Sequence, residues 1–140
     1  MRKHNGGYYV SRHSCFLLQY HMVLVTKYRK PILQDAVKDC VYRILEETLT
    51  SRGCNVVAIN GEADHVHIFF EAGPETSIME TANVLKTRTA RLTRKQYPEE
   101  LKKYYWGSKP MFWTDSYFAT TVGYNNSETV TRYINNQGQD

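Results

Sequence analysis

Two histidines, His65 and His67, flank Val66 and lead directly into an apolar run over residues 68–70. The alternation around a β-branched residue, followed by apolar and aromatic residues, predicts a β-strand. Because alternate side chains of a strand share a face, both imidazoles should point to one surface while Val66 packs behind them. Two neighbouring imidazoles on one surface can hold a single metal ion. This strand therefore constrains both the fold and the chemistry of the chain.

The other elements predicted from apolar periodicity are a mixture of strands and helices. They are a strand over 15–27, a helix from near Asp35 to a stop at Gly53, a strand over 54–59, a helix from Ser77 to about Gln96, irregular aromatic-rich chain over 99–116, a strand over 117–122 and a short helix over 127–137. Asn60-Gly61 predicts the tight turn of a hairpin between the second strand and the histidine strand. Ser77, with Glu80 three residues later, forms a capping box that predicts where the second helix begins.

The order strand–helix–strand–strand–helix–strand is the split βαβ pattern. It predicts an α+β, ferredoxin-like (RRM-like) fold in which two helices pack on a four-stranded antiparallel sheet. The helix over 127–137 follows as an addition. The sequence has no recognisable internal repeat, low-complexity segment or second domain, so we expect one domain over 1–140 that begins with a loosely held basic arm over 1–14.

Composition sets broad limits on function. With 140 residues, 41% of them hydrophobic, the chain can build one ordinary core, and a formal net charge of +4 points only weakly to a nucleic-acid partner. Cys15, Cys40 and Cys54 include no Cys-x-x-Cys pair, which argues against a disulfide framework and a zinc knuckle and fits a reducing cytosol. No apolar run reaches membrane-spanning length and no signal-like segment is recognisable, so we expect a cytoplasmic protein without a membrane partner.

Tyr133 and Gln137, four residues apart on the last predicted helix, lie on one face of it. Alone, the pair is most simply an aromatic side chain packed beside a helix-end amide, and His-x-His alone is more often a surface feature. Two imidazoles leave a metal ion short of ligands, however, and the amide oxygen of Gln137 can serve a hard cation. The Tyr133 phenol, with a pKa of about 10, is a poor nucleophile unless a nearby dication helps remove its proton. His65, His67 and Gln137 are therefore candidate metal ligands, and Tyr133 is the candidate nucleophile.

Two residues near the histidine pair have more ordinary explanations. His21, in the first predicted strand, is expected to be a packed, hydrogen-bonded histidine and not a ligand. Asp64 directly precedes His65, where it is either a partner that orients a metal-bound imidazole or a turn residue at the start of the strand.

The second predicted helix is strongly basic after its first turn. Between Ala82 and Pro98 it holds five basic residues and no acidic residue. A basic run is more often a solvated face, but such faces usually mix both signs of charge. We therefore assign DNA phosphate contacts to the basic residues of this helix and of the turn over 26–31. These are Lys27, Arg29, Lys30, Lys86, Arg88, Arg91, Arg94 and Lys95.

The histidine strand and the Tyr133–Gln137 pair together closely resemble the small single-tyrosine HUH transposases (TnpA type) of prokaryotic insertion sequences. The resemblance runs from about Arg12 to Gln137. It also takes in Tyr20-His21, the turn over 26–31, Leu85-Lys86 and the segment over 116–123. The combination is highly specific, although His-x-His alone is not. Asn135-Asn136 departs from the family, in which acidic residues are frequent there, but neither asparagine is a proposed ligand.

This resemblance implies a transposase that cleaves and rejoins single-stranded DNA bearing hairpins at the ends of a mobile element. Tyr133 would attack a phosphodiester to form a 5′-phosphotyrosine and free a 3′-OH, which can reverse the step without ATP. His65, His67 and Gln137 would hold Mg²⁺, or Mn²⁺, on the scissile phosphate. The family also implies a homodimer with composite active sites. The spacing does not determine whether Tyr133 acts in its own subunit or in the partner.

Three alternatives remain open at the level of sequence. A domesticated HUH nuclease that acts on chromosomal repeats would carry the same residues. A non-catalytic nucleic-acid binder of ferredoxin-like fold would usually stack bases on aromatic residues of the central strands, where this chain has His65 and His67. A metal hydrolase that uses activated water would leave Tyr133 with a structural role only.

Overall fold

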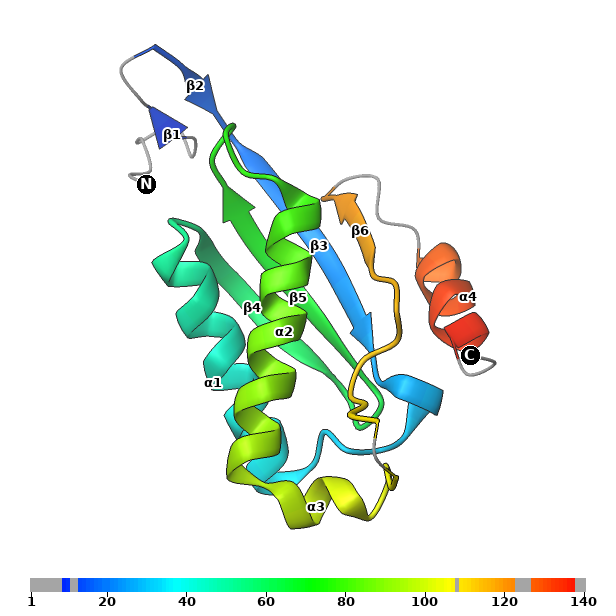
Figure 1. Ribbon diagram of the computed structural model, residues 1–140. Helices are drawn as coiled ribbons and strands as arrows, with labels where there is room; N and C mark the ends of the chain where they lie inside the picture. The colour runs from blue at the N-terminus through cyan, green and yellow to red at the C-terminus, as the bar shows by residue number, and fades with distance from the viewer. Residues whose placement is uncertain (1–8, 11–12, 108, 123–126, 138–140) are drawn as a thin grey trace.

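The computed structural model describes residues 9–10, 13–107, 109–122 and 127–137. Its elements, shown in Figure 1, are β1 (Tyr9–Val10), β2 (Cys15–Phe16), β3 (Leu18–Val25), the 3-10 helix η1 (Lys27–Arg29), α1 (Asp35–Ser51), β4 (Asn55–Glu62), β5 (His65–Ala72), α2 (Ile78–Gln96), α3 (Pro98–Lys102), β6 (Phe118–Thr121) and α4 (Ser127–Gln137). Within these ranges, four strands form an antiparallel sheet in the order β4-β5-β3-β6. With α1 between β3 and β4 and α2 between β5 and β6, this is the predicted ferredoxin-like fold.

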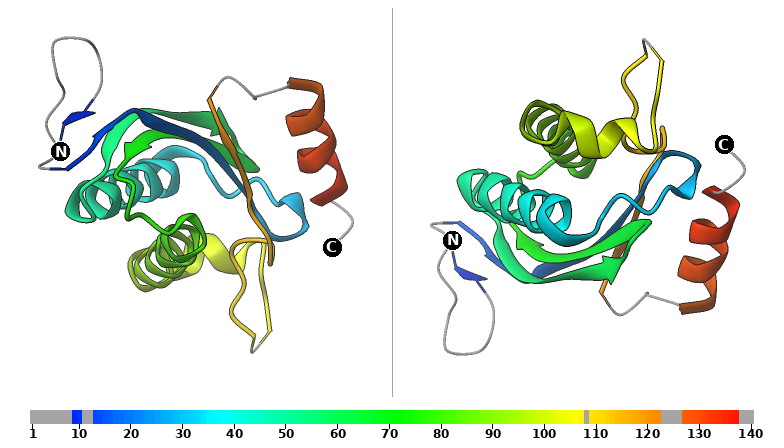
Figure 2. Two further views of the ribbon diagram at one scale, coloured as in Figure 1. Left: turned by 90° about the horizontal axis from the view of Figure 1, so that it is seen from above. Right: turned by 90° about the horizontal axis from the view of Figure 1, so that it is seen from below.

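The central strand β3 has one face for the core and one for the site. Met22 and Leu24 are fully buried in the main core, which also contains residues of α1 and α2. Val23 and Val25 are equally buried but belong to a second, smaller cluster that includes residues of α4. Because alternate strand residues point to opposite faces, α1 and α2 cover one face of the sheet and α4 packs on the other. Figure 2 shows α4 apart from α1 and α2, beyond β6.

Both large helices have approximately the predicted bounds, and local signals explain the start of α2 and the end of α1. The Ser77 side chain accepts a hydrogen bond from the backbone of Glu80, which caps α2 as the capping box predicts. The chain leaves α1 at Gly53, whose φ of 82° lies in the left-handed region that favours glycine. Among the described residues, no helix is long and apolar enough to cross a membrane.

The hairpin between β4 and β5 exists, but the prediction of its turn was wrong. Asn60 and Gly61 are paired within the ladder, opposite His67 and Val66, and the chain reverses beyond Glu62. A β-carbon on Gly61 would lie 2.3 Å from the His65 carbonyl oxygen. The glycine is therefore required by the close approach of two strands and not by a turn.

Two other expectations need correction. In the arm expected to be loosely held, Tyr9 is buried, and its hydroxyl donates a 2.5 Å hydrogen bond to the carboxylate of Glu71. Gln19 and Asn55 donate to the same carboxylate, so β5 anchors the start of the described chain; residues 1–8 and 11–12 lie outside it. The region expected to be irregular contains the short helix α3, which begins at Pro98, a favoured first residue of a helix.

Candidate active site

The histidine strand β5 carries site and core residues alternately. His65 and His67 are half-buried on one face, whereas Val66 and Ile68 are fully buried on the other. The ring centroids of the two histidines lie 5.0 Å apart, with the ring planes almost perpendicular. The imidazole pair therefore shares one face of the sheet, as the alternation predicts, and this is the face on which α4 packs.

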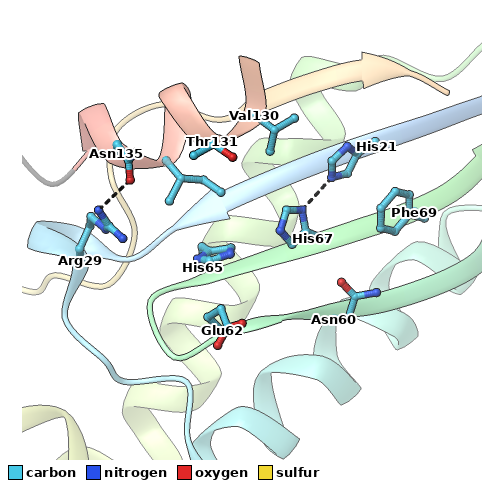
Figure 3. Close-up of a pocket in the computed structure, with 11 residues that line it drawn as sticks. His21, Arg29, Asn60, Glu62, His65, His67, Phe69, Val130, Thr131 and Asn135 are labelled. Carbon is cyan, nitrogen blue, oxygen red and sulfur yellow. Dashed lines mark hydrogen bonds between the residues drawn. The ribbon is translucent and has the colours of Figure 1, made fainter. Parts of the chain in front are cut away.

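A cavity of about 520 Å³ lies beside the imidazole pair, between the sheet and α4 (Figure 3). His65 and His67 line it together with His21 of β3, and α4 contributes Thr131 and Asn135. This is a volume typical of small-molecule sites, and it leaves room for a phosphodiester group beside the histidines.

Asp64 orients His65 by a hydrogen bond. Its Oδ1 lies 2.8 Å from His65 Nδ1, and its Oδ2 accepts from Arg29 Nε at 2.9 Å. Burial opposes the charge of Asp64, but the hydrogen bonds from His65 and Arg29 outweigh burial and hold its pKa below the usual value. An ionised carboxylate can only accept, so the neutral form of His65 carries its proton on Nδ1 and keeps the Nε2 lone pair for a ligand. Asp64 lies in the turn directly before β5 and its carboxylate also orients His65, so the structure is consistent with both explanations considered for it.

His67 has a neighbour of another kind. His67 Nδ1 lies 2.8 Å from His21 Nε2, and the dashed line in Figure 3 marks this contact. His21 is thus packed and hydrogen-bonded, as predicted. Burial, with smaller contributions from the neighbouring His65 and His21, lowers the pKa of His67 to about 4. His67 is therefore neutral at pH 7, the form in which an imidazole binds a metal ion.

The predicted nucleophile and the predicted amide ligand both contact Ser116. The Tyr133 hydroxyl lies 2.9 Å from Ser116 Oγ, which donates to Gln137 Oε1 at 3.2 Å. The Tyr133 ring also packs on Phe118, with 5.5 Å between centroids. Neither Tyr133 nor Gln137 is among the described residues that line the histidine cavity. Within one chain, the structure thus does not bring them to the imidazole pair, and their roles stay predictions.

The donor set beside the cavity is suited to a metal ion but incomplete. Among the described residues, no group of three or more His, Cys, Asp or Glu side chains could hold a metal ion. His65 and His67 offer two imidazole nitrogens, so further ligands must be oxygens of another kind, such as an amide, a phosphate or water. The side-chain amide oxygen of Gln137 is a ligand of this kind, but within one chain it accepts a hydrogen bond from Ser116.

Arg29 links the histidine hairpin to α4. Besides Asp64, its guanidinium contacts Asn135 of α4, with Nη1 3.4 Å from Oδ1 (Figure 3). Arg29 has a φ of 54°, a left-handed conformation uncommon outside glycine, and η1 holds it there. The sequence assigned Arg29 to a DNA phosphate, and any such contact would compete with this pairing.

The predicted DNA-binding residues separate into groups in the structure. Lys27, Lys86 and Arg94 line a second pocket of about 340 Å³, together with Tyr28 and Asp115. Burial lowers the pKa of Lys86; Asp115 opposes this and the charge of Lys27 adds to it. A bound phosphate would favour the charged form of Lys86, so this basic pocket suits an anion.

The remaining basic residues lie elsewhere on the surface. Arg88 Nε donates to Thr48 of α1 at 3.0 Å, which joins the two helices. Arg91 and Lys95 are exposed on α2, and Lys30 is half-buried after η1. The structure therefore gathers three of the eight predicted contacts in one pocket, and it gives Arg88 a structural partner.

Comparison with known proteins places this arrangement in a family. A family described as IS200-like transposases matches residues 14–137. The chain belongs to the IS200-like transposase family. Members of this family are transposases, DNA-cleaving enzymes, so the expectation of a transposase is confirmed.

Two curated relatives of this IS200-like transposase show how far the likeness extends. The ISDra2 transposase TnpA of Deinococcus radiodurans is 32% identical over 122 residues, which covers 87% of this chain and 85% of that protein. The transposase of insertion sequence element IS200 from Salmonella typhimurium is 26% identical over 125 residues, covering 89% and 80%.

Solved structures agree on the fold of this transposase. A crystal structure of a protein from Deinococcus radiodurans R1, described as a transposase, superposes with a TM-score of 0.83 at 32% identity, covering 92% of this chain and 97% of that one. A REP-associated tyrosine transposase bound to a REP hairpin gives a TM-score of 0.55 at 9% identity, covering 89% and 68%, and shares the fold.

Sequence reasoning missed two contacts of this transposase. The pairing of His21 with His67 depends on the register of β3 against β5, and alternation within one strand does not reveal it. Ser116 lies in a segment that supported the family resemblance, but no local pattern indicates that it contacts Tyr133 and Gln137 of α4.

Proposed function

We propose that this IS200-like transposase cleaves and rejoins single-stranded DNA at the ends of an insertion sequence, with Tyr133 as nucleophile and a divalent ion at His65 and His67. The observation that carries the proposal is the pair of oriented imidazoles in a cavity bordered by α4, the helix that carries Tyr133. Family membership supports the DNA substrate, and the neutral state of His67 supports metal binding at pH 7.

The proposed step exchanges one phosphoester bond for another. The Tyr133 oxygen attacks the scissile phosphorus, an O–P bond to the tyrosine forms, and the bond from phosphorus to the 3′ oxygen breaks. The tyrosine is then joined to the 5′ phosphate of the downstream fragment, and the 3′ oxygen of the upstream fragment takes up one proton for the one that the phenol loses. Attack by a 3′-OH on the phosphotyrosine reverses the exchange and rejoins DNA, because the phosphoester bond energy is conserved.

The residues of the imidazole pair are arranged to serve this step. Asp64 keeps His65 Nε2 available, and burial keeps His67 neutral. Mg²⁺ or Mn²⁺, held by His65, His67 and Gln137, would supply Lewis-acid stabilisation of charge on the phosphate. The ferredoxin-like sheet fixes both histidines on one strand, so the pair remains in place whatever position α4 takes.

Completion of the site requires Tyr133 and Gln137 to leave Ser116. Two arrangements achieve this: α4 turns within its own chain, or α4 of a second copy supplies both residues. We propose the second, a homodimer with composite sites. The short α4 packs on the sheet through few apolar residues, chiefly Val130 and Ile134 against Val23 and Val25, so its displacement does not disturb the main core.

The basic pocket gives the DNA strand a route to the imidazole pair. Lys27 and Tyr28 of η1 line the basic pocket, whereas Arg29 of the same turn lines the histidine cavity. The turn η1 thus contributes residues to both hollows. We propose that phosphates of the strand, or of a hairpin beside it, bind Lys86 and Arg94 while the scissile phosphate reaches the histidines.

Covalent trapping tests the proposed nucleophile. The protein is incubated with Mg²⁺ or Mn²⁺ and a labelled single-stranded oligonucleotide containing the element's end, then denatured and separated by electrophoresis. We expect an adduct with the wild type and with Tyr104→Phe, a half-buried tyrosine outside both hollows, and none with Tyr133→Phe. Cleavage that persists in Tyr133→Phe would indicate a hydrolase that uses water. Binding without cleavage by the wild type would indicate a DNA-binding module.

Mixing two inactive variants tests the composite site. His65→Ala and Tyr133→Phe should each form no adduct alone. Mixed after dissociation and reassociation, they should regain up to about a quarter of the wild-type adduct, because one site of a mixed dimer then has both an intact histidine pair and a tyrosine. An active wild type whose two variants never complement each other would indicate that Tyr133 serves its own chain.

A further inference from the structure

His21 lies directly behind one of the two proposed metal ligands. Its Nε2 is 2.8 Å from Nδ1 of His67, and the two rings stack with centroids 5.1 Å apart and planes 25° apart. Figure 3 shows His21 on β3 reaching across to His67 on β5, at the wall of the cavity. Neither the proposed reaction nor the proposed ligand set assigns His21 a role.

The strands and two phenylalanines hold the His21 ring in place. His21 is opposite Phe69 in the antiparallel register, and their rings stack at 4.3 Å with planes only 8° apart. The ring of Phe118 on β6 lies edge to face with the His21 ring, with 6.4 Å between the ring centroids. With 2% of its surface exposed, on a central strand, His21 cannot easily take another position.

The contact between two imidazole nitrogens restricts where the protons lie. One nitrogen must carry a hydrogen and the other must accept it. If His21 Nε2 donates, neutral His67 carries its own proton on Nε2, and that nitrogen cannot bind a metal ion. If His21 Nε2 accepts, His67 carries its proton on Nδ1 and presents a free Nε2 lone pair. The tautomer of His67 is therefore tied to the tautomer of His21.

We propose that His21 is a positioning residue that accepts a hydrogen bond from His67 Nδ1 and so reserves His67 Nε2 for the divalent ion. This inference rests on the metal site of the proposed function. It gives His67 the same kind of support that Asp64 gives His65, because metal-binding histidines usually donate their other N–H to a fixed acceptor. For His67 the acceptor is the neutral imidazole of His21, which is buried. For His65 the acceptor is the carboxylate of Asp64, which is more exposed, so that its charge is less costly.

Nitrogen-15 NMR of histidine-labelled protein without metal tests the tautomer directly. Long-range nitrogen–proton correlations distinguish a protonated from an unprotonated ring nitrogen. We expect His67 to carry its proton on Nδ1 in the wild type at pH 7.5, and His21 to be unprotonated on Nε2. A wild-type His67 that carries its proton on Nε2 would overturn the inference, and this measurement needs no variant.

Two substitutions test the consequence for metal binding. His21→Phe keeps an aromatic ring but removes the acceptor, and His21→Gln keeps an acceptor oxygen. We expect Mn²⁺ affinity, measured by electron paramagnetic resonance without DNA, to fall about 10- to 100-fold in His21→Phe and to recover in large part in His21→Gln. In His21→Phe the His67 tautomers should also mix. Folding of each variant is checked by the dispersion of its amide spectrum.

His65→Ala separates failure of this inference from failure of the metal site. If His65→Ala binds Mn²⁺ as the wild type does, the metal site of the proposed function is wrong. If His65→Ala loses binding while a folded His21→Phe keeps wild-type affinity, the metal site stands and His21 has a packing role only.

Discussion

The hydroxyl groups of Tyr133 and Ser116 lie 2.9 Å apart, on α4 and just before β6 respectively. The same serine donates to Gln137, one turn further along α4. A single hydroxyl group therefore contacts both side chains that the proposed reaction needs at the histidines. Whatever displaces α4 has to break these two hydrogen bonds together.

Ser116→Ala should loosen α4 without affecting the sheet. Each of the two side-chain hydrogen bonds contributes about 0.5–1.5 kcal/mol, or about 1–3 kcal/mol together, so we expect amide hydrogen exchange in α4 to rise about 5- to 150-fold. Exchange in β3 and β5 should not change. The matched control is Ser51→Ala, which removes a hydroxyl at the end of α1 that donates to the backbone carbonyl of Thr48 in the same helix. Equal exchange in α4 of the wild type and Ser116→Ala would show that the serine does not retain the helix.

Gly61→Ala should destabilise the histidine hairpin. The added β-carbon would lie 2.3 Å from a backbone oxygen of His65, which neither strand can avoid without moving. We expect the free energy of unfolding to fall by about 2–4 kcal/mol in urea denaturation.

Gly53→Ala is the matched control for this substitution. Gly53 has a left-handed φ of 82° but nothing within 4 Å of an added β-carbon, so its cost should be only about 1 kcal/mol. Two glycine variants of equal stability would contradict the crowding inferred between Gly61 and His65.

Acid should destabilise the protein through His67. The unfolded chain has a histidine pKa near 6.5, whereas in the folded protein the pKa of His67 is lowered to about 4. Between these values the unfolded chain binds more protons, so this contribution to stability is complete above about pH 6.5 and is lost as pH falls toward 4. The titratable groups that act on the pKa of His67 are His65 and His21, and the charged side chains of Arg29 and Glu62 line the same cavity.

Comparison of two glutamine variants isolates this contribution. The free energy of unfolding, measured between pH 7.5 and 4.5, should fall less in His67→Gln than in the wild type. The exposed His13→Gln should retain the wild-type slope. An unchanged slope in His67→Gln would mean that acid acts through another group.

Arg94 and Arg88 should differ in their effect on DNA binding, although both lie on α2. Arg94 lines the basic pocket, whereas Arg88 bonds to Thr48. Arg94→Ala should weaken binding of a single-stranded oligonucleotide and reduce the slope of log affinity against log salt by about 0.7, the value for one phosphate contact. Arg88→Ala makes the same change of charge and should leave that slope nearly unchanged. If Arg88→Ala reduced the slope and Arg94→Ala did not, the DNA phosphate contact would instead lie on the flank of α2 that faces α1.

Local patterns in the sequence were enough to predict the imidazole pair and the fold. Alternation places His65 and His67 on one face of β5, and the order of strands and helices indicates the ferredoxin-like topology. What could not be predicted depends on contacts between distant segments. Asn60-Gly61 has the composition of a turn, but the pairing of β4 with β5 extends past it, and only the approach of the His65 carbonyl explains the glycine.

The position of α4 also depends on contacts between distant segments. The spacing of Tyr133 and Gln137 shows that they share a helix face, which their common contact with Ser116 confirms. No local signal determines toward which part of the molecule that face turns. Tyr9 is a similar case, because its burial depends on Glu71, 62 residues further along the chain.

The alternation along β5 has a consequence for how this strand can change over time. Its odd-numbered residues from His65 to Glu71 point to the face of the sheet that carries the histidine pair. Its even-numbered residues from Val66 to Phe70 point to the core. An insertion or deletion of one residue within β5 would exchange the two sets, with imidazoles turned toward α1 and α2 and apolar side chains exposed. A change of one residue in the length of this strand is therefore far more disruptive than a substitution within it.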